Sequence, residues 1–209
     1  MFSSTAAVYG EPHTSPIPES HPLAPINPYG AGKMVVERIL ADSHAAGGPA
    51  FCALRYFNAA GADPDGELRE NHRPETHLIP LAIDAALGKS PEISLFGTDY
   101  PTEDGTCVRD YAHVADIADA HVLALKRVLE GGEPLVANLG AGTGVSVRDV
   151  LSAVATVTGR PVPVKTGPRR AGDPAVLVAD PTRAKRELGW RPMRSDLTTV
   201  LQDAYRSRR

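Results

Sequence analysis

The chain has 209 residues, of which 42% are hydrophobic and 22% are charged, and its formal net charge is −3. This composition is that of an ordinary globular protein with enough apolar residues for a core. The small negative charge excludes a broad electrostatic attraction to nucleic acid or to an anionic membrane, and no uncharged apolar run reaches the ~18 residues of a membrane span. No signal peptide pattern is found at Met1, so we expect a cytoplasmic protein. The two cysteines, Cys52 and Cys107, have no CxxC or metal-ligand spacing, and we expect them to be reduced and half-buried.

Residues 1–4 indicate the end of a strand that runs into a Ser/Thr turn. Six prolines from Glu11 up to and including Pro28 predict a loop. Asn27 can cap a helix and Pro28 can take its first position, so we predict a helix over 28–44 that ends before Gly47-Gly48-Pro49. Residues 51–56 are typical of a buried strand. A strand, a helix and a strand in this order predict a parallel βαβ unit.

The rest of the chain alternates in the same way. We predict a polar loop over 57–75, helices over 77–87, 115–129 and 146–158, and two short helices at the C-terminal end. Strands are expected at 93–96, at 108–114 running into the helix that follows, at 135–139, and near 162–165 and 176–179.

Tyr29 and Lys33 are the most informative pair of residues. Their spacing of four places a phenol and an ammonium on one face of the predicted helix. A free tyrosine has a pKa of ~10, which must fall by about 3 to make a base near neutral pH. A neighbouring lysine and a cationic nicotinamide ring would both favour that fall. Alone, the pair is as easily an exposed helix contact. Ser3-Ser4-Thr5 strengthens the catalytic interpretation, because open α/β sheets bind ligands at the carboxyl ends of their strands.

These residues belong to a longer set of segments that resembles a known family. The set comprises Ser3-Ser4-Thr5-Ala6-Ala7-Val8-Tyr9-Gly10, Pro28-Tyr29-Gly30 with Lys33, Leu54-Arg55-Tyr56-Phe57-Asn58, His77-Leu78-Ile79-Pro80, residues 95–106, Val108-Arg109-Asp110-Tyr111, residues 169–173 and Glu187-Leu188-Gly189-Trp190. It resembles the extended short-chain dehydrogenase/reductase family, and within that family the UDP-glucose 4-epimerase branch. The stretch 97–111 is its most specific part, and the resemblance covers essentially the whole chain.

The resemblance implies an α/β fold: an incomplete Rossmann-type doubly wound parallel sheet with a smaller α/β substrate-binding lobe. Residues 1–60 would be the C-terminal part of the NAD-binding domain, with segments near 105–140 returning to it. Residues 61–209 would be mainly the nucleotide-sugar-binding lobe. The implied reaction interconverts UDP-glucose and UDP-galactose with NAD as cofactor, and the full-length protein would be a homodimer.

The resemblance also assigns roles to individual residues. Tyr29 would be the base, Lys33 would hold the nicotinamide ribose, and Thr5 would bond the sugar hydroxyl; serine stands at that position in many relatives. Tyr56 and Phe57 would lie beside the nicotinamide. The implied substrate contacts, with the guanidinium groups meeting the diphosphate, are Asn58, His77, Leu78, Phe96, Arg109, Arg170, Asp173 and Leu177. Without the resemblance, the arginines would be ordinary surface ion pairs.

Other functions stay open. A nucleotide-sugar 4,6-dehydratase would need an acidic pair after Thr5, where the chain has Ala6-Ala7. A pentose or uronate 4-epimerase and a non-catalytic nucleotide-sugar-binding remnant remain alternatives. Leu177 stands where the family has a residue that limits the 2-substituent of the sugar, and leucine is smaller than the tyrosine that excludes N-acetyl sugars. Turnover of UDP-N-acetylglucosamine is therefore a further hypothesis.

Two further patterns resemble ligand-binding motifs without matching them. Gly140-Ala141-Gly142-Thr143-Gly144 is followed by Val145 instead of the glycine that a dinucleotide fingerprint needs. We therefore interpret it as a tight turn in the substrate lobe. The seven histidines show no HExxH or other ligand spacing, so we expect no metal site.

The dinucleotide fingerprint belongs to the first βα turn of a Rossmann fold, and none precedes Thr5. About 120 residues, four βα units of ~30 each, would be needed to build that part of the sheet. The sequence is then either a fragment or late-start product, which we favour, or a truncated protein that has lost cofactor binding. We expect the isolated chain to fold poorly and to bind NAD weakly, because its sheet would have an uncovered edge.

Overall fold

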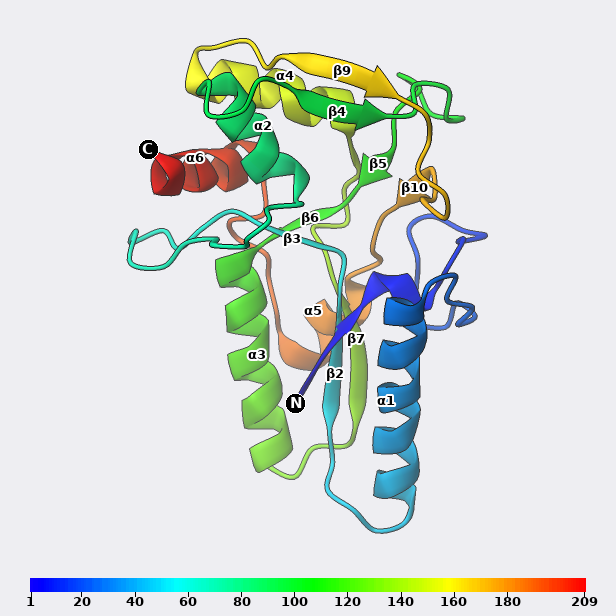
Figure 1. Cartoon of the computed structure of the whole chain (residues 1–209). Coiled ribbons are helices and arrows are strands. Elements are labelled where there is room, and N and C mark those ends of the chain that lie inside the picture. The colour runs from blue at the N-terminus through cyan, green and yellow to red at the C-terminus, as the bar shows by residue number, and fades with distance from the viewer.

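The computed structural model describes all residues from 1 to 209 and shows two bodies joined by short strands (Figure 1). The lower body is built on a parallel sheet in the order β1 (Phe2–Thr5), β2 (Cys52–Tyr56), β7 (Leu135–Leu139). Helix α1 (Pro28–Ala45) connects β1 to β2, which are parallel, so the predicted βαβ unit is confirmed.

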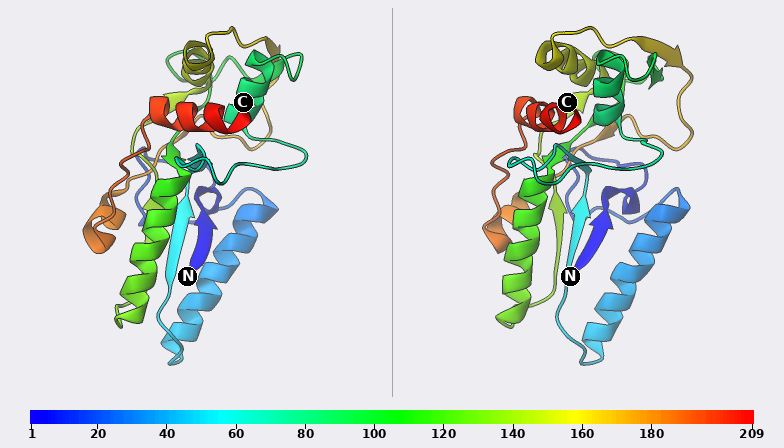
Figure 2. Two further views of the ribbon diagram at one scale, coloured as in Figure 1. Left: turned by 90° about the vertical axis from the view of Figure 1, so that its left-hand side faces the viewer. Right: turned by 60° about the vertical axis from the view of Figure 1, so that its left-hand side comes forward.

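Figure 2 shows α1 and α3 (Val114–Leu129) on opposite faces of this sheet. Helix α5 (Thr182–Leu188) packs beside β7. Because both faces of the sheet are covered, β2 is almost wholly buried. Its residues are buried one after another, without the alternation of buried and exposed side chains seen in a strand with one solvent face. The core on the α3 side includes Leu54, Leu139 and Trp190, all fully buried.

Helix α1 begins where the sequence predicts. The N–H of Gly30 donates to Oδ1 of Asn27 at 2.8 Å, and Pro28 occupies the first turn. The first N–H groups of a helix have no backbone partner, and the Asn27 side chain satisfies one of them. The local signal is therefore sufficient to fix the beginning of the helix that carries Tyr29.

The upper body contains three packed helices and one pair of parallel strands. Helices α2 (Leu78–Ala86), α4 (Val147–Thr158) and α6 (Leu197–Arg208) bury a shared apolar core, and β4 (Ile93–Phe96) pairs with β9 (Val164–Gly167). Ser146 caps α4 as predicted, since its Oγ accepts from the N–H of Asp149 at 3.0 Å.

Short strands connect the two bodies. β3 (Asn58–Ala60) pairs in parallel with β6 (Tyr111–His113). β5 (Val108–Arg109) lies between β10 (Val176–Leu177), which is parallel to it, and β8 (Val145–Ser146), which is antiparallel. A 3-10 turn, η1 (Ala6–Val8), follows β1. The segment 105–146 thus runs from these connecting strands into the lower sheet and returns to them. The division of the chain into domains stays a prediction.

Four local predictions are wrong. The expected Ser/Thr turn at residues 3–5 is part of β1, and the expected loop 57–75 contains β3. The strand expected near 162–165 is present, at Val164–Gly167, because Pro161 and Pro163 lack the N–H that a ladder needs. Both cysteines are free and fully buried instead of half-buried. The glycine turn at 140–144 follows β7 in the lower sheet and is not in the upper body. None of the helices is both long and apolar enough to cross a membrane.

Candidate active site

A cavity of about 1100 Å³ lies between the two bodies, beyond the carboxyl ends of β1 and β2. This is the position at which open parallel sheets bind their ligands. Of the residues that the sequence singles out, the cavity wall includes Thr5, Tyr29, Tyr56, Phe57, Asn58, His77, Leu78, Phe96, Arg109, Arg170 and Asp173. Residues as far apart in the chain as Thr5 and Asp173 therefore meet at one site.

Tyr29 and Lys33 lie at the start of α1, as their spacing predicts. The Lys33 ammonium is 5.6 Å from the centre of the Tyr29 ring and 5.0 Å from that of Phe2. Its Nζ donates to the carbonyl oxygen of Ser3 at 2.7 Å. Tyr29 is 60% exposed, and its ring lines the cavity. Lys33 itself does not line the cavity. It is linked to the site by its contacts with the Tyr29 ring and with the Ser3 carbonyl oxygen of β1.

Each residue of Ser3-Ser4-Thr5, at the carboxyl end of β1, has a different partner. Ser3 Oγ accepts from the Tyr56 hydroxyl at 2.8 Å, and Ser4 Oγ donates to Glu37 at 2.5 Å. Thr5 Oγ1 accepts from the N–H of Ala7 at 3.2 Å, which leaves its own proton free to donate. Ser4 and Thr5 both line the cavity, but the Ser4 proton is engaged by Glu37, so Thr5 is the one of the two whose proton is free to donate.

A buried polar network, which the sequence did not predict, lies beneath this end of β1. Glu37 of α1 accepts two hydrogen bonds from the Arg55 guanidinium, at 2.5 and 2.9 Å. Arg55 also donates to the Tyr9 hydroxyl at 2.9 Å, which donates to Asn138 at 2.7 Å. Burial raises the pKa of Tyr9 above its ordinary value, although Arg55 opposes that change. The sequence did contain one signal for this network. Arg55 is a charged residue inside an otherwise apolar buried strand, and such a charge needs a buried partner.

The cationic side of the cavity contains Arg109 and Arg170. Arg109 is largely buried and donates to the carboxylate of Asp173 and to the carbonyl oxygen of Val108. The Arg170 guanidinium lies 4.0 Å from the centre of the Phe96 ring. The four predicted substrate residues Phe96, Arg109, Arg170 and Asp173 therefore form one group, in which one cation is already paired and the other is stacked on an aromatic face.

Leu177 lies elsewhere. It is in β10, beside Arg109 in the ladder, and packs against the small apolar cluster of Ala6, Val8, Tyr9 and Ile17. It does not line the cavity. Its role as a limit on the size of the sugar stays a prediction that this arrangement does not support.

Asp110 is a second buried residue that the sequence did not assign. Its carboxylate accepts from the N–H groups of Ala141 at 2.6 Å and of Gly142 and Ala179 at 3.0 Å. Burial raises the pKa of Asp110 to about 6, and these three N–H groups oppose the rise. A Cβ at Gly140 would lie 2.4 Å from Oδ2 of Asp110. The glycine turn therefore binds a carboxylate of the chain itself, so its N–H groups are not free for a phosphate.

A parallel sheet with a Tyr-x-x-x-Lys helix beside its strand ends defines a Rossmann-type α/β protein, and the cavity at those strand ends is lined by arginine. The model of the NAD dependent epimerase/dehydratase family matches residues 1–140, and the chain belongs to this family. The resemblance seen in the sequence is confirmed.

Individual relatives agree with the family. The chain is 51% identical over 205 residues to a UDP-glucose 4-epimerase of Rhizobium leguminosarum bv. trifolii, a match that covers 98% of this chain and 62% of the relative. The crystal structure of UDP-glucose 4-epimerase from Brucella ovis in complex with NAD superimposes with a TM-score of 0.94 at 51% identity, covering 98% of this chain and 63% of that one. The enzyme from Bifidobacterium longum in complex with NAD⁺ and UDP has a TM-score of 0.92 at 39% identity, over 99% of this chain and 62% of that one. This chain thus spans about three fifths of the length of the relatives it matches.

Proposed function

We propose that this chain carries the base and the nucleotide-sugar site of a UDP-glucose 4-epimerase, which interconverts UDP-glucose and UDP-galactose with NAD. The observation that carries the proposal is the position of Thr5, Tyr29, Arg109 and Arg170 around one cavity. It is supported by relatives bound to NAD and to UDP. The proposed assembly is a homodimer and the proposed compartment is the cytoplasm, as the family resemblance implies.

The residues around Tyr29 fit a nicotinamide cofactor. Tyr56 and Phe57 provide aromatic and apolar surface at the carboxyl end of β2, and the Lys33 ammonium lies beside Tyr29 for a ribose hydroxyl. Lys33 and Thr5 would therefore position the cofactor ribose and the substrate hydroxyl on either side of the phenol. NAD, when bound there, supplies the acceptor and later the donor of a hydride at C4 of the sugar.

The proton is handled by the chain itself. The Tyr29 phenolate takes the proton of the sugar 4-hydroxyl while Thr5 donates a hydrogen bond to the same oxygen, and Tyr29 returns the proton after the sugar has presented its other face. Lys33 favours the phenolate because a cation beside a phenol stabilises its charged form. Catalysis of this kind needs a firmly held diphosphate and a loosely held sugar. Arg109 and Arg170 meet the first requirement, because a guanidinium pairs with two phosphate oxygens at once.

The test combines a binding and a turnover measurement on the 209-residue chain. Isothermal titration with UDP should show saturable binding. Incubation with UDP-galactose and a large excess of NAD should produce UDP-glucose, quantified by anion-exchange chromatography. Absence of UDP binding overturns the proposal. Turnover of a pentose or uronate UDP-sugar in place of UDP-galactose overturns the substrate, and UDP binding with no turnover of any UDP-sugar overturns the catalytic part. A parallel incubation with UDP-N-acetylglucosamine decides whether the N-acetyl group is tolerated.

A further inference from the structure

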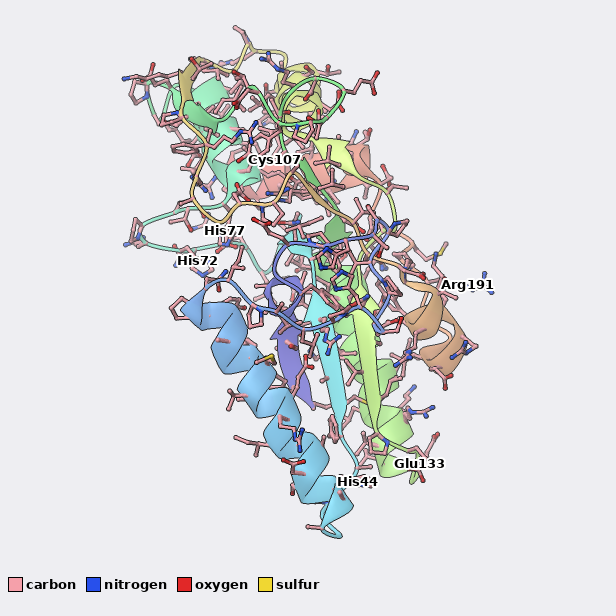
Figure 3. The ribbon with its side chains drawn as sticks, turned by 90° about the vertical axis from the view of Figure 1, so that its right-hand side faces the viewer. His44, His72, His77, Cys107, Glu133 and Arg191 are labelled. Atoms are coloured by element: carbon pink, nitrogen blue, oxygen red, sulfur yellow. The ribbon has the colours of Figure 1, made fainter.

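The segment between β3 and α2 brings together three side chains that the mechanism leaves without a shared role. They are Glu70, His72 and His77, each of which offers one ligand atom, and these atoms all lie within 4.8 Å of one another. The two imidazole rings are 5.0 Å apart between centres and inclined by 63°. Figure 3 shows His72 and His77 close together at the level of the cavity, and all three residues line its wall.

We propose that Glu70, His72 and His77 bind a divalent transition-metal ion of the zinc class at the rim of the cavity. Two imidazole nitrogens and one carboxylate oxygen are a ligand set that zinc prefers. Ligand atoms around a tetrahedral zinc stand about 3.3 Å apart, given bonds of ~2.0–2.2 Å. The Glu70 carboxylate is already in contact with Nδ1 of His72, so these two ligand atoms would separate around the ion, and a pair as far apart as 4.8 Å would close by about 1.5 Å. Side-chain rotation can accommodate both changes, because His72 and His77 are 62% and 50% exposed.

A second layer of contacts supports the geometry of His77. Its Nδ1 lies 2.7 Å from Oε1 of Glu75, whose other oxygen is buried, has no hydrogen bond, and faces the Arg208 guanidinium at 3.8 Å. Glu75 itself is only 10% exposed. A hydrogen bond from Nδ1–H to a fixed carboxylate leaves Nε2 of the same ring with a free lone pair and a defined direction. Metal-bound histidines commonly have this arrangement.

The charge of the site also favours a cation. Glu70 contributes one negative charge and two neutral imidazoles add none, so three protein ligands leave a divalent ion with a net positive charge and a fourth position for water. Because Glu70 and His72 lie in a loop and His77 is the N-cap of α2, the ion would tie that loop to the start of the helix. The spacing of five between His72 and His77 matches no metal motif, which is why the sequence predicts no site here.

The experiment is a zinc titration of the full 209-residue chain, with a chromogenic chelator as competitor. The wild-type chain is expected to bind one equivalent, and His72→Ala, His77→Ala and Glu70→Gln are each expected to weaken binding at least tenfold. Glu75→Gln, which changes only the second layer, is expected to weaken it by about 10- to 100-fold. His44→Ala is the matched control, because His44 is an exposed histidine with a carboxylate, Glu133, 4.0 Å away at the far end of the molecule (Figure 3). It should leave the affinity unchanged.

Cobalt substitution provides a second measurement that does not depend on affinity. Co²⁺ bound by the proposed ligands should give the visible d–d bands of a four-coordinate site, and these should be lost in the His72→Ala/His77→Ala double variant. Zinc should also slow tryptic cleavage after Arg69, beside the first ligand, in the wild type and not in the double variant. The proposal is overturned if the double variant retains the zinc equivalent or the cobalt spectrum, or if wild type binds zinc no better than the double variant does.

Discussion

At the scale of single residues, Tyr29 is the most exposed of the side chains to which we assign a catalytic role. Replacing it by phenylalanine removes the acidic proton and keeps the ring over which Lys33 lies. We expect Tyr29→Phe to lower the turnover of UDP-galactose by at least about 10²-fold, the usual loss for a general base, and to leave UDP affinity within experimental error. Turnover is measured with NAD in large excess. Tyr205→Phe, on α6, is the control and should keep full turnover; equal turnover by Tyr29→Phe would exclude Tyr29 as the base.

Arg109 is the second residue with a role that substitution can separate from folding. Its guanidinium is already oriented by Asp173 and Val108, so a diphosphate would meet a preformed fork. We expect Arg109→Lys, which keeps the charge and loses the fork, to weaken UDP binding by about tenfold or more, given about 1.5–3 kcal/mol for hydrogen bonds to charged groups. Calorimetry measures the change. Arg127→Lys, at a half-buried pair with Glu187 that does not line the cavity, should bind UDP as the wild type does.

Asp110 gives a prediction about pH. Its pKa is raised from 3.8 to about 6 in the folded chain. An acid with a raised pKa in the folded state favours folding most below its unfolded pKa, and this contribution is lost as pH rises through the folded value. Taking about 1.4 kcal/mol per pKa unit, ionisation of Asp110 should cost roughly 3 kcal/mol between pH ~4 and ~6.5.

The measurement compares urea unfolding of wild type and Asp110→Asn across that pH range. Asparagine cannot ionise, so the free energy of unfolding of wild type relative to the variant should fall as pH rises and become constant above about pH 7. Other carboxylates contribute equally to both proteins and cancel in the difference. A difference that grows with pH would mean that the three N–H groups around Asp110 outweigh its burial.

At the scale of elements, α1 is tied to the sheet by the buried pair of Glu37 and Arg55, whose side chains are 6% and 5% exposed. Glu37→Ala leaves the Arg55 guanidinium buried without its carboxylate, and we expect a loss of about 3–5 kcal/mol in the free energy of unfolding. Arg38→Ala is the control on the same helix. It breaks an exposed pair with Asp42, which is worth no more than about 0.5 kcal/mol. Urea unfolding of both variants measures these changes. Similar losses in the free energy of unfolding would show that the buried pair does not hold α1 on the sheet.

Elements with a local signal were predictable from the sequence. The start of α1 follows from Asn27 and Pro28, and that of α4 from Ser146, because a cap needs only residues within one turn. β3 was missed, since a three-residue strand has no period of its own and forms only against β6, some fifty residues later. The same limit applies to Glu37: nothing within one turn of α1 indicates Arg55 as its partner.

At the scale of the whole molecule, the sequence resemblance predicted 11 of the 32 residues that line the cavity. Those at the ends of β1 and β2 could be placed together because the carboxyl ends of parallel strands share one edge of a sheet. The residues it did not predict depend on contacts between distant segments. Asp110 meets the glycine turn about thirty residues later, and His72 turns toward His77 within an irregular loop. Leu177 shows the converse, because the resemblance implied a substrate contact for it while its side chain packs away from the cavity.

The outer edge of the lower sheet leads to the last prediction. β1 hydrogen-bonds to β2 and to no other strand, and the sequence contains no complete glycine fingerprint, since Val145 interrupts the nearest match. The residues beside Tyr29 offer surface for the nicotinamide end of NAD, whereas a dinucleotide is normally held through its pyrophosphate at a glycine-rich helix start. We therefore expect the 209-residue chain to bind UDP saturably and NAD only weakly. Calorimetric titrations with UDP, NAD and nicotinamide mononucleotide should show similar weak affinities for the last two. An NAD affinity far above that of the mononucleotide would require a site for the adenine half within this chain.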